Sequence, residues 1–138
     1  MKISDLGEFG LIDLIADIVG EPRNESLLIG IGDDAACWRG DGLQLATGDT
    51  LVEGVHFTLG DTSWRDLGWK ALAVNLSDIA AMGGVPRYAI VSLGLPGDSE
   101  ADDIAEFYKG MLELARRFGV QIVGGDTVGA PQVVISVT

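Results

Sequence analysis

Cysteine, histidine and basic side chains are scarce in this sequence. The single cysteine, Cys37, excludes an internal disulfide and favours a reducing compartment such as the cytoplasm. With one cysteine and one histidine, the chain has no ligand set for zinc. Nine Lys and Arg against 21 Asp and Glu give a net charge of -12. That balance argues against nucleic acid and anionic membrane surfaces as partners, because both need basic patches. It suits a protein that binds cations.

Long apolar stretches are also absent, so we expect no membrane span. Acidic residues from Asp5 to Asp17 interrupt the start of the chain, which argues against a secretory signal. Proline is limited to 4 residues, whereas glycine reaches 20 and gathers beside aspartates, where it lets the backbone approach a ligand. A length of 138 residues with 47% hydrophobic side chains predicts one globular domain over 1–138.

Hydrophobic periodicity predicts a mixture of helices and strands. Ser63 with Asp66, and Ser99 with Asp102, have the spacing of helix caps. The final strand pattern runs to Thr138 with no terminating signal, which fits either a fragment of a longer protein or a last strand that pairs at a sheet edge. Helices are expected over 4–19, 63–82 and 99–118, and strands over 27–31, 43–46, 52–59, 87–95, 120–123 and 132–138.

Four aspartates share one pattern, in which an apolar run leads into small residues and then into the acid. Any one of them alone is best interpreted as an Asx-turn that closes a loop. If all four converge, their mutual repulsion calls for a divalent cation among them. Magnesium fits, because it prefers carboxylate oxygens and bridges to phosphate. The four are Asp34, Asp49, Asp78 and Asp126.

Asp78 is the most informative of the four, because it lies in a predicted helix rich in apolar residues, where a lone carboxylate is costly to bury. It either has a partner, lies on an exposed face or caps a neighbouring loop. Lys70, two helical turns earlier, either neutralises acids or phosphate or is a solvated helix lysine.

The remaining singled-out side chains have simple structural interpretations. Trp64, Trp69 and Phe107 are most simply core residues. The ring of Tyr108 fits the apolar stripe of its helix, while its hydroxyl needs a partner. A lone histidine such as His56 is more often structural than catalytic.

The segment Gly30–Ala35 matches the G-x-G-x-x-A pattern of dinucleotide-binding proteins. That pattern needs a helix N-terminus to hold the pyrophosphate. Residues 37–42 are instead typical of a turn, and two aspartates stand where the pyrophosphate would lie. The chain also has no P-loop motif, so a bound nucleotide would need metal in place of the P-loop lysine.

Taken in order, five segments resemble the thiamine-monophosphate kinase family, which belongs to a superfamily that includes aminoimidazole ribonucleotide synthetase. The resemblance covers nearly the whole chain but only the N-terminal half of those enzymes. The segments are 7–9 (Gly-Glu-Phe), Gly30–Ala35, Asp49–Phe57, Lys70–Gly83 and Gly124–Thr127.

This resemblance implies transfer of the γ-phosphoryl group of ATP to thiamine monophosphate, giving thiamine diphosphate. It also implies an α+β fold, in which a mixed β-sheet packs on helices on one side and two such sheets pair into a dimeric β-barrel. The implied partners are ATP, thiamine monophosphate and a second copy of the chain. The implied site residues are Asp34, Thr47, Gly48, Asp49, Asp78 and Asp126 for Mg²⁺, His56 for the thiamine substrate, and Tyr108 and Gly125 for ATP.

The sequence departs from the family pattern at two places. Gly48 stands where family members usually have threonine, so a backbone carbonyl but no side-chain hydroxyl is available there. Val128-Gly129 stands where a polar pair is usual, which removes a candidate phosphate contact. We also expect the family's C-terminal half, which completes the acceptor pocket, to lie outside these 138 residues.

Two other functions stay open at this point. One is another ATP-dependent enzyme of the same superfamily with a different phosphate acceptor. The other is a non-catalytic dimerisation module that binds a divalent cation and has no use for ATP. The chain lacks the D-x-[DN]-x-[DN]-G loop, which argues against a calcium form of that module.

Overall fold

The computed structural model describes residues 1–21 and 24–138. The three predicted helices are confirmed, and the first bends at Gly7, which has a φ of 70°. In chain order the elements are α1 (Ile3–Val19), β1 (Leu27–Ile29), β2 (Cys37–Trp38), β3 (Asp49–Val52), α2 (Trp64–Ala81), β4 (Tyr88–Leu95), α3 (Ala101–Phe118), β5 (Gln121–Gly129) and β6 (Val134–Val137).

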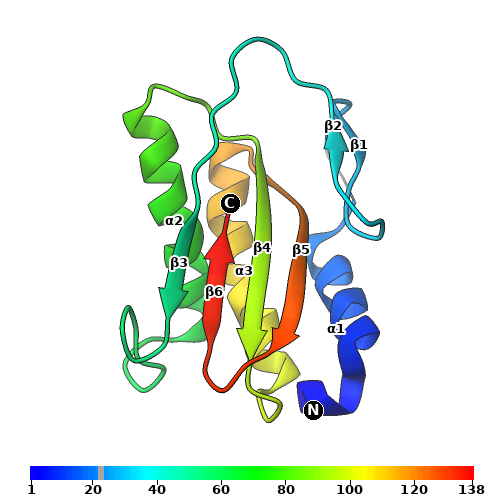
Figure 1. Cartoon of the computed structure of the whole chain (residues 1–138), viewed down its shortest axis with the longest axis vertical. Coiled ribbons are helices and arrows are strands. Elements are labelled where there is room, and N and C mark those ends of the chain that lie inside the picture. Colours follow the sequence, from blue (N-terminus) through cyan, green and yellow to red (C-terminus); the bar gives the residue numbers. More distant parts are fainter. Residues whose placement is uncertain (22–23) are drawn as a thin grey trace.

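The main sheet has four strands in the order β3-β6-β4-β5, and β1 pairs with β2 in a separate ribbon. β4 is parallel to β5 and antiparallel to β6, and β6 is antiparallel to β3, so the sheet is mixed. Figure 1 shows α2 and α3 behind one face of this sheet, whereas the face toward the viewer is uncovered. The expected α+β fold is thereby confirmed. The described residues of this single chain form no closed barrel.

The core lies between the sheet and the two helices, because side chains alternate between the two faces of a strand. Leu93 of β4 and Ile135 of β6 are buried against this side, together with Phe107 of α3. The strand residues that alternate with these buried ones, such as Ser92 and Ser136, belong to the uncovered face and are only half-buried. The sheet therefore has one apolar face and one mixed face.

Helices α2 and α3 approach each other until their backbones touch. A Cβ atom on Gly68 would overlap the carbonyl oxygen of Phe107, and one on Gly110 would overlap the carbonyl oxygen of Arg65. Each helix therefore offers a glycine where the other offers a peptide carbonyl. Only a residue without a side chain allows this approach, so these two glycines set the position of α2.

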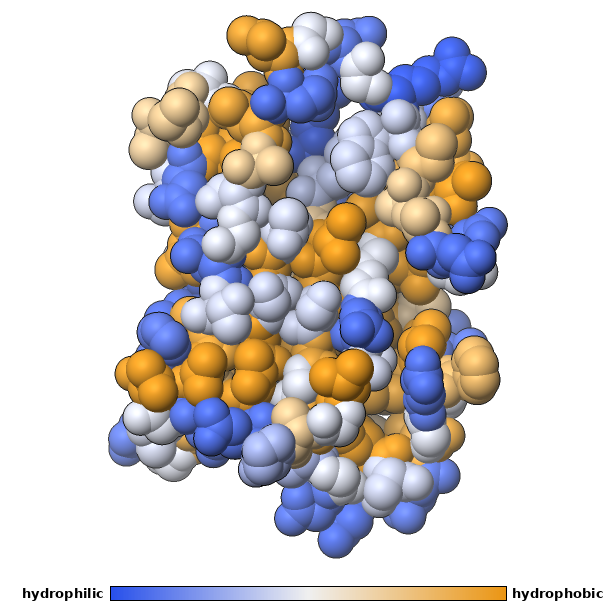
Figure 2. Space-filling model, in the orientation of Figure 1, coloured by the Kyte–Doolittle hydropathy of each residue, from blue (hydrophilic) through white to orange (hydrophobic). Residues whose placement is uncertain are grey.

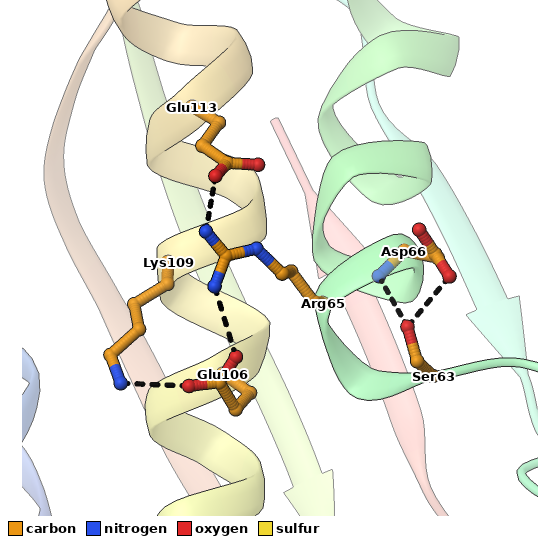
Figure 3. Close-up of polar contacts among 6 residues, drawn as sticks. All are labelled: Ser63, Arg65, Asp66, Glu106, Lys109 and Glu113. Atoms are coloured by element: carbon orange, nitrogen blue, oxygen red, sulfur yellow. Dashed lines mark hydrogen bonds and ion pairs between the residues drawn. The ribbon is translucent and has the colours of Figure 1, made fainter.

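Charged side chains bridge the same two helices at the surface (Figure 3). Arg65 of α2 pairs with Glu113 and, at 3.2 Å, with Glu106 of α3. Lys109 joins Glu106 at 2.7 Å. Hydrogen bonds from Lys109 and then Arg65 lower the pKa of Glu106. All four side chains are more than one-third exposed, so they add little stability, and the glycine contact beneath them matters more.

One of the two predicted helix caps is present. The Ser63 hydroxyl oxygen accepts a hydrogen bond from the backbone N–H of Asp66 at 3.1 Å and donates to its carboxylate at 2.6 Å (Figure 3). The cap predicted at Ser99 is wrong. The residue before α3 is Glu100, which makes no side-chain cap bond. Ser99 instead accepts a hydrogen bond from the N–H of Ile3 through its backbone carbonyl, at 2.9 Å, and so holds the start of α1.

Two aromatic residues follow the core prediction and one does not. Phe107 is fully buried, and Trp64 is half-buried at the edge of the core. Trp69, in contrast, is 42% exposed. It directly follows Gly68, which faces α3, and successive helical residues point about 100° apart. The tryptophan therefore turns away from the helix interface.

The strand predictions were less accurate than the helix predictions. Residues 43–46 form no strand, and Leu43 is fully exposed because no neighbouring strand pairs with it. The strand predicted over 52–59 is displaced to β3, which is followed by a turn. Residues 37–38, interpreted as part of a turn, pair with β1. β5 continues through 124–127, which we expected to follow the strand.

Alanine in place of Gly110 tests the backbone contact between α2 and α3. Helix propensity alone predicts that Gly110→Ala stabilises the protein by about 0.5–1 kcal/mol. The overlap with the Arg65 carbonyl predicts the opposite sign, a loss of about 1–3 kcal/mol in the free energy of unfolding, because the helices must separate. Urea denaturation measures the difference. Gly97→Ala is the control, since its Cβ would lie in open space, and a stabilised Gly110→Ala variant would contradict this packing.

Candidate functional site

The edge strand β3 and helix α2 lie side by side and run in opposite directions (Figure 1). Polar contacts join them near both ends. Before β3, the Thr47 hydroxyl donates to the Asp78 carboxylate at 3.0 Å. After β3, the Lys70 ammonium donates to the backbone carbonyl oxygen of His56 at 2.9 Å. Residues from two of the five segments, Asp49–Phe57 and Lys70–Gly83, are thus held together with Thr47 on one strand–helix pair.

The Thr47–Asp78 contact distinguishes between the alternatives considered for Asp78, namely a partner, an exposed face or a loop cap. The carboxylate is exposed at the C-terminal end of α2 and has a hydroxyl partner. Next to Thr47, the space that a side chain on Gly48 would fill lies 3.3 Å from the hydroxyl oxygen of Thr138. A hydroxyl group, that of Thr138, therefore lies beside Gly48.

Asp49 and Asp126 lie far from each other. Asp49 is in β3 and Asp126 in β5, which are the two outer strands of the sheet. Three strand spacings of about 4.8 Å separate them by about 14 Å. Asp49 shares the face of the buried Leu51, whereas Asp126 pairs with Ser92 on the uncovered face. One ion cannot contact both carboxylates of a single chain.

Asp126 ends a row of polar side chains across the uncovered face. The strand register aligns Thr50, Ser136, Ser92 and Asp126 from one edge of the sheet to the other. The Thr50 hydroxyl donates to Ser136 at 3.1 Å. The Asp126 carboxylate also accepts a hydrogen bond from the N–H of Thr127 at 2.8 Å. Asp126 is therefore accessible from the open side of the sheet, away from α2.

Asp34 lies in the exposed segment between β1 and β2. Its N–H donates to the carboxylate of the preceding residue, Asp33, at 2.8 Å. In the described part of the chain, the element that follows Gly30–Ala35 is strand β2 and not the helix that a dinucleotide-binding motif needs.

Among the described residues, no three His, Cys, Asp or Glu side chains lie close enough together to hold a metal ion. The convergence of four aspartates in one pocket is therefore not found within this single chain. Magnesium commonly uses only one or two carboxylates and completes its shell with water and phosphate. The Thr47–Asp78 pair meets that smaller requirement with oxygen donors of the right kind.

Asn75 lies on α2 three residues before Asp78 and lines the same cleft as Thr47, and sequence reasoning missed it. Its side chain is buried, and its Oδ1 has no hydrogen-bond partner in the described part of the chain. Its Nδ2 donates to the carbonyl oxygen of Ala71 at 3.0 Å. An unpaired buried acceptor is costly, so a cation or its bound water would satisfy it. The signal was available in the sequence, because Asn75 and Asp78 are three residues apart and share a helix face.

A cleft of about 370 Å³ opens beside Thr47 and Asn75, between the 38–47 segment, α2 and the ends of β4 and β6. The rings of Trp38 and Tyr88 meet there at a centroid distance of 4.9 Å. Two guanidinium groups, those of Arg39 and Arg87, also line it. Figure 2 shows a hollow in the upper part of the uncovered face, where these segments meet. Aromatic faces and cations beside oxygen donors suit an anionic ligand with a ring.

His56 is held by the tight loop that follows β3. The N–H of Val52 donates to its Nδ1 at 3.0 Å, so the neutral ring carries its proton on Nε2. Glu53 anchors the loop to the sheet by accepting a hydrogen bond from the N–H of Val133 at 3.1 Å. Gly54 takes a φ of 77°, and Phe57 buries its ring. The exposed His56 therefore offers an Nε2–H donor to a ligand.

Tyr108 is 3% exposed, and its ring packs edge-on against Phe107 at 5.4 Å. Burial raises the pKa of its hydroxyl, which stays protonated at neutral pH. In this conformation the side chain offers a ligand almost no surface.

Gly125 has a structural role in the sheet. It lies opposite Val91 in the parallel pair of β4 and β5. A Cβ atom there would overlap the carbonyl oxygen of Val91. Glycine is therefore required for the pairing of these two strands, whatever else its exposed backbone contacts.

The fold and these contacts define an α+β domain whose edge strand and adjoining helix present oxygen donors beside a cleft. Among the described residues, no helix is long and apolar enough to cross a membrane. The chain belongs to the family of the AIR synthase related protein, N-terminal domain, whose family model matches residues 32–138.

Individual relatives point to one branch of this family. The chain is 45% identical to the thiamine-monophosphate kinase of Bacillus subtilis (strain 168), over 96% of this chain and 41% of the relative. It is 42% identical to the crystal structure of thiamine-monophosphate kinase from Stenotrophomonas maltophilia K279a, with a TM-score of 0.76, over 92% of this chain and 40% of that one. The structure of AaThiL complexed with AMPPCP and TMP is 36% identical, with a TM-score of 0.65, over 99% of this chain and 42% of that one. The chain thus spans about two-fifths of the length of these relatives.

Gly125 and its neighbour Gly124 form a matched pair for testing the structural role. Gly125→Ala should lower the free energy of unfolding by about 1–3 kcal/mol, because its Cβ overlaps the Val91 carbonyl. Gly124→Ala should change it little, since no atom lies within 4 Å of its Cβ position. Denaturation curves of both variants measure this difference. Equal stabilities would show that β4 and β5 do not approach as closely as described.

Proposed function

We propose that this chain is the part of a cytoplasmic thiamine-monophosphate kinase that binds ATP and Mg²⁺. The observation that carries the proposal is the 36–45% identity to thiamine-monophosphate kinases over nearly the whole chain. The contacts of the E-G-V-H-F and N-L-S-D segments on one strand–helix pair support it. Because the chain spans about two-fifths of these relatives, the activity belongs to a protein that also carries the C-terminal half of the family.

The residues proposed to hold Mg²⁺ are those of the family resemblance, and Thr47 and Asp78 are the best supported. Their contact at 3.0 Å and the unpaired oxygen of Asn75 provide the hard oxygen donors that this ion prefers. Held by these residues, Mg²⁺ would neutralise negative charge on the phosphates during phosphoryl transfer. Gly48, Asp49, Asp34 and Asp126 complete the proposed set. Asp126 and Asp49 serve different ions or different copies of the chain, because about 14 Å separates them.

In the proposed reaction, a terminal oxygen of thiamine monophosphate attacks the γ-phosphorus of ATP. A new P–O bond forms, the bond to the β-phosphate oxygen breaks, and ADP leaves. The chain's own groups position the two reactants. The Nε2–H of His56 donates to the acceptor phosphate. Asp78 lies near the end of α2 at which the nucleotide is proposed to bind. Lys70, which contacts His56, and Asp78 are eight residues and about 12 Å apart along α2.

The nucleotide itself is proposed to lie near the cleft beside Thr47. The tilted pair of Trp38 and Tyr88 and the guanidinium of Arg39 suit a base and phosphates. Among the ATP contacts implied by the resemblance, Gly125 offers exposed backbone, whereas Tyr108 would have to gain exposure before it touched ATP.

We further propose that the chain forms a homodimer through the uncovered face of its sheet, closing two sheets into a barrel. Ile90 and Val128 leave apolar surface on that face, at 36% and 57% exposed. Among the described residues, the outer strands β3 and β5 each have one edge that pairs with no further strand. A second copy would cover both features.

Binding of ATP with and without Mg²⁺ tests the metal assignment. Calorimetry should show that the 138-residue chain binds ATP weakly and only when Mg²⁺ is present. The same chain should turn over little ATP. The chain joined to the C-terminal half of its relatives should form thiamine diphosphate. Asp78→Asn should weaken Mg²⁺-dependent binding by at least about tenfold, because one donor charge is lost. Asp98→Asn, at an exposed turn, is the charge-matched control.

Each alternative function has its own outcome in the same experiments. Cation binding without any Mg²⁺-dependent ATP binding would favour the non-catalytic module. Turnover of ATP with another phosphate acceptor, but not with thiamine monophosphate, would favour a different enzyme of the superfamily.

Charge placed on the open sheet face tests the dimer. Ile90→Asp should convert a dimer into a monomer in analytical ultracentrifugation, since the carboxylate would be buried between two sheets. Met82→Asp is the control, because this exposed residue follows the end of α2 and belongs to no strand of the sheet. A monomeric unsubstituted chain at micromolar concentration, or a dimeric Ile90→Asp variant, would contradict the proposed interface.

A further inference from the structure

Lys70 makes a contact that the proposed reaction leaves unexplained. Its side chain is exposed on α2, and its ammonium donates to the backbone carbonyl oxygen of His56 at 2.9 Å. Among the described residues it forms no ion pair, unlike Lys109, which is paired with Glu106. In a chain with a net charge of -12, this lysine thus binds a carbonyl oxygen although acidic side chains are abundant.

The loop around His56 sets its own shape through internal bonds. The N–H of His56 donates to the carbonyl oxygen of Val52 at 2.9 Å, and the N–H of Gly54 donates to that of Phe57 at 2.8 Å. The N–H of Val52 holds the imidazole through Nδ1. These bonds fix the conformation of the loop and the tautomer of the ring. The buried ring of Phe57 and the bond between Glu53 and Val133 hold the loop to the sheet and the core. The Lys70 contact adds a hydrogen bond that joins the residue next to this anchor, His56, directly to α2.

We propose that Lys70 is a positioning residue, which holds the His56 imidazole at a set distance from the Asp78 end of α2. This inference rests on the proposed role of His56 toward thiamine monophosphate. A hydrogen bond from a charged donor is stronger than one between neutral groups, and α2 is a rigid base for it. Phosphoryl transfer depends on placing donor and acceptor phosphates in line, and small displacements cost rate.

Solution NMR tests the positioning directly, without any activity. The backbone amides of Val55 and His56 should be ordered in the unsubstituted chain. In Lys70→Met their order parameters should fall to about 0.6 or below, with no change in the denaturation midpoint. Lys109→Met is the matched control, because it removes the same charge from α3 and should leave the loop ordered.

Kinetics on the chain joined to the C-terminal half test the consequence. Lys70→Met should raise KM for thiamine monophosphate about tenfold, the size expected for one hydrogen bond from a charged donor. KM for ATP should stay unchanged, and Lys70→Arg should recover most of the loss because it can still donate to the carbonyl.

The outcomes separate this inference from the proposed function. An ordered loop in Lys70→Met would overturn the positioning role whatever the kinetics, and a raised KM with an ordered loop would identify Lys70 as a direct phosphate contact instead. A disordered loop with an unchanged KM for thiamine monophosphate would support Lys70 as the anchor of the loop. It would at the same time overturn the proposed role of His56.

Discussion

The backbone contact between α2 and α3 is the constraint on which the site depends. Gly68 and Gly110 each face a carbonyl oxygen of the other helix, so the two helices form one rigid layer with a fixed spacing. That layer covers one face of the sheet and fixes α2 beside the edge strand β3. Since α2 carries Lys70, Asn75 and Asp78, a shift in the helix contact would move these three side chains relative to β3.

The pair formed by β3 and α2 holds the candidate residues in two separate contacts and does not gather them into one cluster. Thr47 meets Asp78 before β3, and His56 meets Lys70 after it. The two contacts are separated by about 12 Å along the helix, so the site proposed for the nucleotide and the site proposed for the acceptor phosphate share one scaffold. A phosphotransferase needs this kind of fixed separation, because the protein contributes mainly positioning and charge neutralisation.

Local signals predicted the helices well, because periodicity, the Ser63 cap and the glycine at 119 act within a few residues. Strand bounds were predicted poorly, because a strand exists only where a partner lies beside it. Leu43 to Ala46 has a strand pattern but no partner, whereas Gly125 is in a strand because Val91 pairs with it. The roles of Lys70 and Asn75 were missed or left open for the same reason, since both depend on neighbours distant in the sequence or on burial.

What the amino-acid sequence determined by itself is the chemistry available: oxygen donors for a hard cation, a single histidine, few cations and glycines at set places. Residue type and short-range order are enough for such conclusions. Only the tertiary structure decided which of these groups meet. It joined Thr47 to Asp78 across 31 residues and put Asp49 and Asp126 on opposite edges of the sheet. The pairing of strands and the approach of two helices depend on the packing of the whole chain, and no local pattern encodes the resulting distances.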